Sequence, residues 1–125
     1  MLYKQNTLAL GTILTDEYRI LQYNGHGGLS LTYLAEHLTD GRTPLVKELF
    51  DAEYMERTSP DTSMHIRDAV FLSEYLIDRQ RFLSEWEIMK LFKEYPGAAI
   101  PIDYIEANNT ACIVNPPLMS TSIDT

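Results

Sequence analysis

The chain has 125 residues, 45% of them apolar or aromatic, and a formal net charge of −8. A chain of this length can bury one hydrophobic core, whereas two independent domains would be hard to stabilise. Acidic residues outnumber basic ones by 18 to 10, which argues against a nucleic-acid or anionic-membrane surface because phosphate recognition needs clustered Lys and Arg. We therefore expect a single domain whose partner is a protein or a small molecule.

The sequence shows no sign of secretion or of membrane insertion. The one cysteine, Cys112, has no second cysteine with which to form an internal disulfide, and residues 1–6 include no apolar stretch of signal-peptide length. No run approaches the roughly 20 apolar residues that a membrane helix requires. We expect a cytoplasmic protein that does not contact a membrane.

Three segments with strand character open the chain, at residues 18–23, 31–37 and 44–49, all rich in Leu, Tyr or β-branched residues. Between the second and the third lies Thr39-Asp40-Gly41-Arg42, in which Asp-Gly supplies the positive φ angles of a tight hairpin turn. The second and third segments should therefore be antiparallel neighbours. A loop is expected over residues 51–65.

A long helix is expected over residues 67–94, which contain neither Pro nor Gly. Apolar and aromatic residues recur there at helical spacings of three, four and seven. They are Phe71, Tyr75, Phe82, Trp86, Met89 and Phe92. The pattern allows a break near Asp78, and Tyr95-Pro96-Gly97 ends the helix because Pro cannot continue it.

Two more strands are expected at residues 100–106 and 110–114, joined by a hairpin at Ala107-Asn108-Asn109. Pro116-Pro117 and a Ser/Thr-rich end then indicate a linker or tail. The predicted fold is α+β, with a five-stranded antiparallel sheet and one long helix. Residues 1–118 would form the domain and residues 119–125 the tail.

A glycine-rich segment, Asn-Gly-His-Gly-Gly-Leu-Ser at residues 24–30, lies between two predicted strands. A dinucleotide-binding loop would instead run into a helix. Glycines allow backbone N–H groups to approach phosphate oxygens, so Gly25, Gly27, Gly28 and Ser30 are candidate phosphate-binding residues. A plain glycine-rich hairpin is the alternative.

Two charged residues favour the phosphate interpretation. Lys47 lies on the third predicted strand, from which its ammonium group can reach a phosphate, although a lone lysine is more often a surface residue. Glu85 follows Phe82 by three residues and precedes Met89 by four, on or beside the apolar stripe of the helix. A carboxylate that faces a sheet is costly unless paired, so we expect Lys47 to pair with Glu85. If the stripe is rotated by one residue, Glu85 is a solvated acid instead.

In this order the motifs resemble the N-terminal lobe of bacterial, eukaryotic-like serine/threonine protein kinases. Residues 25–35 look like the glycine-rich loop and second strand, Leu45-Val46-Lys47-Glu48 looks like the third strand, and Phe82-Leu83-Ser84-Glu85 resembles the helix that carries the lysine's glutamate partner. Residues 105–114 resemble the hairpin that leads to the hinge. The resemblance covers about residues 13–118. It implies ATP as ligand. The binding residues would be the glycine-loop residues, Lys47 and Glu85, together with Asn115 at the gatekeeper position and Leu118 at the hinge.

The catalytic half of that family has no counterpart in the sequence. Neither a His-Arg-Asp nor an Asp-Phe-Gly motif is present, and these motifs supply the catalytic Asp and the metal ligands. His65-Ile66-Arg67-Asp68 is no substitute because it precedes Glu85. The histidines show no metal-ligand spacing with Cys112. We expect no catalytic residue and no metal held by this chain alone.

The nucleotide site implied by the resemblance departs from the family pattern. Ser30 stands at the third glycine, Asn24 replaces an apolar residue that roofs the adenine, and Leu45 replaces a small alanine. Overpacking by a bulkier side chain typically costs about 1–3 kcal/mol. Asn115 falls at the gatekeeper position, and Pro116-Pro117 removes N–H donors at the hinge while Leu118 keeps its own. The sequence therefore predicts weak ATP binding.

Three functions follow as hypotheses. The first is a noncatalytic kinase-like lobe that acts as a protein-interaction or regulatory module, whose exposed apolar underside is covered by a protein partner or a second copy. The second is the ATP-binding half of a serine/threonine kinase whose catalytic lobe is absent from this chain. The third is an unrelated α+β domain in which Lys47 lies far from Glu85. The distance between these two side chains separates the third hypothesis from the others.

Overall fold

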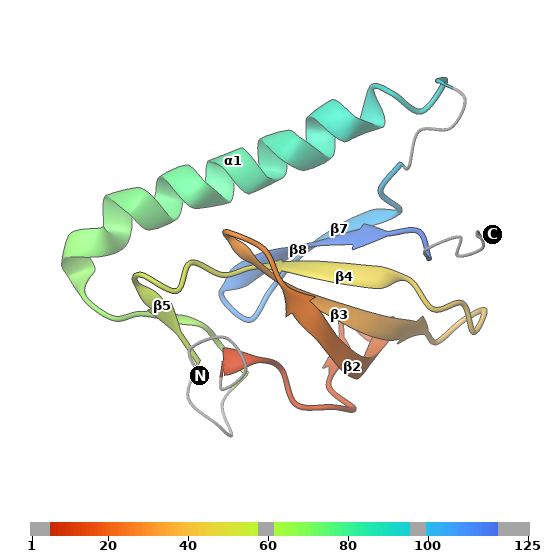
Figure 1. Cartoon of the computed structure of the whole chain (residues 1–125), viewed down its shortest axis with the longest axis horizontal. Helices are drawn as coiled ribbons and strands as arrows, with labels where there is room; N and C mark the ends of the chain where they lie inside the picture. Colours follow the sequence, from red (N-terminus) through yellow and green to blue (C-terminus); the bar gives the residue numbers. More distant parts are fainter. Residues whose placement is uncertain (1–5, 58–61, 96–99, 118–125) are drawn as a thin grey trace.

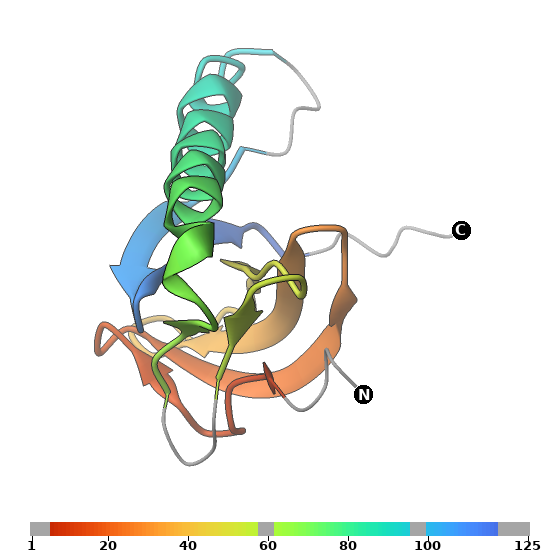
Figure 2. The same ribbon diagram turned by 90° about the vertical axis from the view of Figure 1, so that its left-hand side faces the viewer.

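The computed structural model describes residues 6–57, 62–95 and 100–117. Figure 1 shows an antiparallel sheet with one long helix, α1 (Leu72–Lys90), lying across one side of it. Figure 2 shows that the sheet curls until it is nearly barrel-shaped. The α+β class and the single long helix are as predicted.

The sheet has six strands in the order β1-β2-β3-β4-β8-β7. Their bounds are Ile13–Leu14 (β1), Tyr18–His26 (β2), Ser30–His37 (β3), Leu45–Leu49 (β4), Asp103–Ala107 (β7) and Thr110–Asn115 (β8). The prediction of five strands was wrong because it missed β1. This strand has only two residues and pairs with β2 through a turn in which Thr15 and Asp16 have positive φ, so it is too short to show a period of two.

Two hairpin turns contain positive φ angles within segments that the sequence indicated as turns. Asn108 and Asn109 both have positive φ, which is the conformation that a tight β7–β8 turn requires. In the β3–β4 connection Gly41 has a φ of 77°, but Asp40 does not have a positive φ, so Asp-Gly does not supply both of the expected angles. These turns make β3 and β4, and β7 and β8, antiparallel neighbours as expected.

The segment predicted as a loop over 51–65 carries a small second sheet instead. Strands β5 (Met55–Glu56) and β6 (His65–Ile66) pair antiparallel. The main helix begins later than predicted, at Leu72, after a short 3-10 turn at Ala69–Phe71 that Asp68 caps. It continues through Asp78 without a break.

Alternation along the central strands places the two faces of the sheet in different surroundings. Leu31, Tyr33, Val46 and Glu48 are fully buried inside the curled sheet, where they meet residues of β2, β7 and β8. The opposite face packs against α1 through a separate small cluster. Its members are Leu49, Phe82, Ala111 and Ile113, with Trp86 and Tyr104 beside them. The helix is therefore anchored to β4 and β8, next to Lys47.

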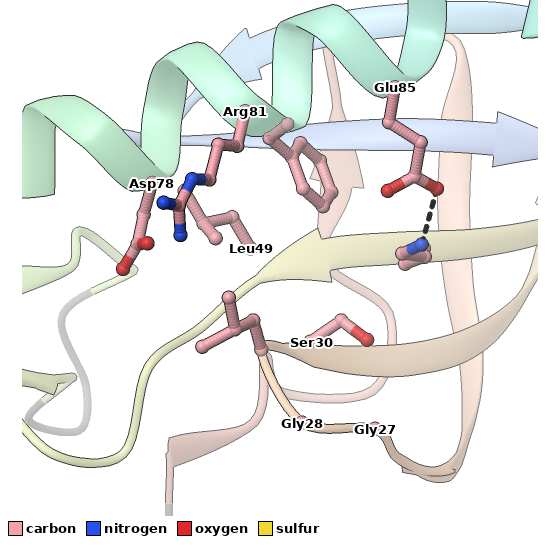
Figure 3. Close-up of a pocket in the computed structure, with 10 residues that line it drawn as sticks. Gly27, Gly28, Ser30, Leu49, Asp78, Arg81 and Glu85 are labelled. Carbon is pink, nitrogen blue, oxygen red and sulfur yellow. Dashed lines mark hydrogen bonds and ion pairs between the residues drawn. The ribbon is translucent and has the colours of Figure 1, made fainter.

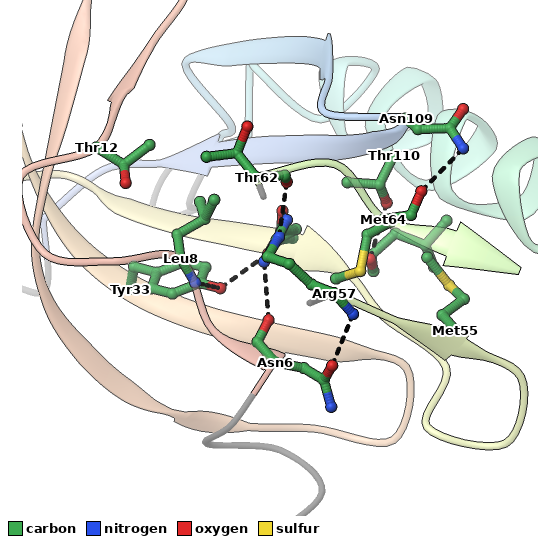
Figure 4. Close-up of polar contacts among 12 residues, drawn as sticks. Asn6, Leu8, Thr12, Tyr33, Met55, Arg57, Thr62, Met64, Asn109 and Thr110 are labelled. Atoms are coloured by element: carbon green, nitrogen blue, oxygen red, sulfur yellow. Dashed lines mark hydrogen bonds and ion pairs between the residues drawn. The ribbon is translucent and has the colours of Figure 1, made fainter. Parts of the chain in front are cut away.

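A buried ion pair joins the inside of the sheet to the segment that follows β4. The guanidinium of Arg57 contacts both carboxylate oxygens of Glu48, at 2.5 and 3.2 Å, and neither side chain is more than 3% exposed. Arg57 also donates to the backbone carbonyls of Asn6 and Thr62 (Figure 4). The hydroxyl of Tyr33 donates to Glu48 and accepts the N–H of Leu8. The network ties the N-terminal segment and the β5–β6 region to the barrel interior.

Arg57→Met tests the weight of this network, because it keeps an apolar stem but leaves the carboxylate of Glu48 buried and unpaired. We expect the free energy of unfolding to fall by about 3–5 kcal/mol. Urea denaturation measures this loss. The matched control is Arg19→Met, which removes an exposed pair with Glu36 and should cost less than about 1 kcal/mol. Equal losses of unfolding free energy in the two variants would contradict a stabilising role for the buried pair.

Candidate functional site

Lys47 points away from the barrel interior because it alternates with Val46 and Glu48 along β4. It lies in register with Thr32 on β3 and Ile113 on β8. Its ammonium nitrogen is 2.5 Å from Oε2 of Glu85 and 5.7 Å from the centre of the Phe82 ring. The side chains of Lys47 and Glu85 are 31% and 44% exposed. The predicted pair is therefore formed at a partly open position, which excludes the hypothesis that required the two residues to be far apart.

The pair lies at one side of a pocket of about 280 Å³ between the glycine-rich loop and α1 (Figure 3). The loop contributes Gly27, Gly28, Leu29 and Ser30, β4 contributes Lys47 and Leu49, and the helix contributes the remaining residues. These are Asp78, Arg81, Phe82 and Glu85. Five of the residues expected from the sequence thus meet around one cavity: Gly27, Gly28, Ser30, Lys47 and Glu85.

The glycine-rich loop is the tight connection between β2 and β3. The N–H of Gly27 donates to the carbonyl of Ser30 at 2.9 Å and closes the turn. A Cβ on Gly27 would come within 3.2 Å of the Ser30 hydroxyl, whereas nothing lies within 4 Å of the same position on Gly28. The backbone at Gly28 is therefore accessible from the pocket side.

Two other predicted residues, Gly25 and Asn115, do not line the pocket. Gly25 lies within β2 opposite Thr32, at a register shift where its φ of 130° suits glycine, and it does not line the pocket. Asn115 is half-buried at the end of β8, opposite Leu45, on the face of β4 that carries Lys47. Leu118 lies outside the described residues. The expected hinge contacts to adenine therefore stay a prediction.

Asp78 and Arg81 are pocket residues that the sequence interpretation missed. They precede Glu85 by seven and four residues, so their positions on the same side of the helix were a readable signal. Asp78 is buried and accepts the hydroxyl hydrogen of Tyr54 at 2.7 Å. Burial and the neighbouring Asp78 carboxylate raise the pKa of the Tyr54 hydroxyl. This bond also explains why Asp78 does not interrupt the helix: its carboxylate is occupied outside the helical backbone.

Asp51, just after β4, adds a second carboxyl group beside Asp78. Its Oδ1 accepts the N–H of Glu53 at 2.9 Å. Burial, together with hydrogen bonding to and repulsion from Asp78, raises the pKa of Asp51 above its usual value of 3.8. The hydrogen bond from Tyr54 to Asp78 holds the loop after β4 against the first half of α1.

Within the described ranges, no group of three or more His, Cys, Asp or Glu side chains is arranged to hold a metal ion. No helix among the described residues is long and apolar enough to cross a membrane.

Comparison with solved structures finds a neighbour with the same arrangement of elements. The chain is 25% identical to PpkA-294 in its apo form, a fragment of a bacterial serine/threonine kinase, with a TM-score of 0.81. The chain has a kinase-related fold. The match covers 89% of this chain and 38% of the PpkA-294 chain. No family model and no curated protein matches the chain.

Asp51→Asn tests the carboxyl pair beside the pocket. A raised pKa in the folded state means that the contribution of Asp51 to stability is full below pH 3.8 and is lost as pH rises through the raised pKa. Asparagine keeps the acceptor for Glu53 and does not ionise. We therefore expect a higher melting temperature than wild type at pH 7, with the difference vanishing towards pH 4. Glu87→Gln, an exposed change on α1, should show no such convergence.

Proposed function

We propose that this kinase-like lobe is a noncatalytic protein-interaction or regulatory module. The observation that supports the proposal most is the apolar surface left on α1 and just beyond its end. A helix that carries apolar residues around most of its circumference is usually buried on more than one side. The exposed apolar residues of α1 and of the turn that follows it include Ile77, Ile88, Leu91, Phe92 and Tyr95. Exposed apolar side chains gathered within residues 88–95 favour a protein interface.

The charges around these side chains favour a second copy of the chain as the first partner to test. Glu87, Lys90, Lys93 and Glu94 line a hollow at the end of the helix together with Leu91 and Tyr95. Two acids and two bases thus lie beside the apolar residues. In a two-fold contact, the lysines of one copy can face the glutamates of the other, which makes the surface self-complementary.

Analytical ultracentrifugation over a range of protein concentrations tests this interaction. We expect reversible association of the wild type, lost in Ile88→Glu/Leu91→Glu because two buried carboxylates would oppose each other in the contact. Leu10→Glu, an exposed change outside residues 88–95, is the matched control. A wild type that stays monomeric at the highest concentration would count against self-association, and association unchanged by the double variant would remove the helix from the interface.

The second candidate function is the ATP-binding half of a serine/threonine kinase. The contact between Lys47 and Glu85 beside the glycine-rich loop favours it, because this pair holds the lysine where nucleotide phosphates are bound in that family. The half-buried Leu45 and Asn115 on the same face of the sheet favour weak binding. Both candidates fit the cytoplasmic location expected from the sequence.

Nucleotide-dependent stabilisation tests the second candidate. Millimolar ATP with magnesium should raise the melting temperature of the wild type by an amount that grows as RT ln(1 + [ligand]/Kd). Lys47→Ala should reduce the increase, since it removes the cation beside the loop. No increase in the wild type, together with no effect of Lys47→Ala, would make nucleotide binding untenable.

A further inference from the structure

Arg81 is the charged residue of the pocket that has no assigned partner. Lys47 is paired with Glu85, and Asp78 accepts the hydroxyl hydrogen of Tyr54. Among the described residues, no hydrogen bond or ion pair involves the guanidinium of Arg81. Figure 3 shows its side chain extending from α1 towards Leu49 at the wall of the pocket, beside Asp78 but without a contact drawn to it.

The opposite wall of the pocket offers backbone and hydroxyl groups. Gly28 is exposed, with open space where a side chain would stand, and the Ser30 hydroxyl lines the same cavity. Consecutive backbone N–H groups in a glycine-rich turn form concavities that suit anions. Arg81, which has no partner among the described residues, therefore lies across the pocket from a loop whose exposed backbone suits an anion.

The chemistry of the two walls selects the ligand. A guanidinium presents planar, paired N–H donors that match the oxygens of phosphate, and it stays charged at any physiological pH. Glu85 is neutralised by Lys47, so the acid that remains to oppose an anion is Asp78, whose Oδ2 is already hydrogen-bonded. The pocket volume of about 280 Å³ falls just below the roughly 300–1,000 Å³ typical of sites for whole drug-sized ligands. Its size suits a phosphate group or a short polyphosphate better than an entire nucleotide.

We propose that Arg81 and the glycine-rich loop form a subsite for phosphoryl groups, in which Arg81 is a second cation besides Lys47. The ligand class is a polyphosphate, either free or as the phosphate chain of a nucleotide. The proposal deepens the second candidate function, on which it rests for assigning phosphate chemistry to the pocket. It does not require that adenine be recognised.

Isothermal titration calorimetry in metal-free buffer tests the subsite with three probes: inorganic triphosphate, ATP and adenosine. We expect the wild type to bind triphosphate and ATP, and adenosine more weakly than either. Arg81→Gln should weaken triphosphate binding about tenfold, as expected for the loss of hydrogen bonds to a charged group. The affinity of Arg81→Lys for triphosphate should lie between those of the wild type and Arg81→Gln, because lysine keeps the charge and loses the planar donor pair.

Two controls separate binding from folding. Arg19→Gln removes an exposed arginine on β2 outside the pocket and should bind triphosphate as the wild type does. The melting temperature of Arg81→Gln should match that of the wild type, since no contact within the described chain is lost. If Arg19→Gln weakens triphosphate binding as much as Arg81→Gln does, the effect is a general one of net charge, and the proposal is overturned.

The outcomes distinguish this inference from the nucleotide function. Triphosphate binding that depends on Arg81, with ATP bound no more tightly than triphosphate, supports the subsite and counts against nucleotide recognition. Equal binding of ATP by the wild type and Arg81→Gln overturns the subsite and leaves the nucleotide function standing. If the wild type binds neither triphosphate nor ATP at millimolar concentration, both fail.

Discussion

Glu48 and Arg57 form an ion pair that is almost wholly buried inside the curled sheet. Because side chains alternate along a strand, the orientation of Glu48 into the interior also fixes that of its neighbour Lys47, which must point out towards α1. A shift of one residue in the pairing of β4 would exchange the two and bury the lysine. The position of Lys47 thus depends on a structural pair on the other face of the sheet.

The outer face of the sheet also carries an ion pair, which is less buried. Lys47 and Glu85 meet where α1 crosses β4, and Phe82 packs on the sheet one helical turn earlier. An ion pair at this exposure contributes little to stability. Its arrangement is better explained by the position in which Glu85 holds the ammonium group of Lys47, beside the pocket. The glycine-rich loop ends at the same place, which is why loop, lysine and glutamate enclose one pocket.

Much of this arrangement is readable in the sequence because it rests on local patterns. The period-two strands, the Asn108-Asn109 turn and the apolar spacing around Glu85 each reflect the geometry of a single element. These patterns predicted the antiparallel pairs, the long helix and the contact of Lys47 with Glu85. The order of the motifs, rather than any one of them, carried the resemblance to kinases, and the structural neighbour agrees with it at the level of the fold.

The missed features depend on contacts between residues distant in sequence or on elements too short to show a period. Arg57 lies in a segment that looked like a polar loop, and nothing local reveals that its guanidinium is buried against Glu48. Strand β1 has two residues. Asp78 resembled a helix break because its partner, Tyr54, lies 24 residues away. The sequence around Arg81 does not distinguish it from a surface arginine, because the glycine-rich loop across the pocket is distant in sequence.

We propose that, whether or not this kinase-related fold acts as an interaction module, the glycine-rich loop, β4 and α1 form a pocket for phosphate. The most direct test of this proposal is an NMR titration of the labelled wild type with ATP, followed through backbone amide shifts. We predict that the largest changes fall at Gly27, Gly28 and Lys47 and that residues of the barrel interior, such as Tyr33, stay unchanged. Changes centred on another surface, or no changes at millimolar ATP, would contradict it.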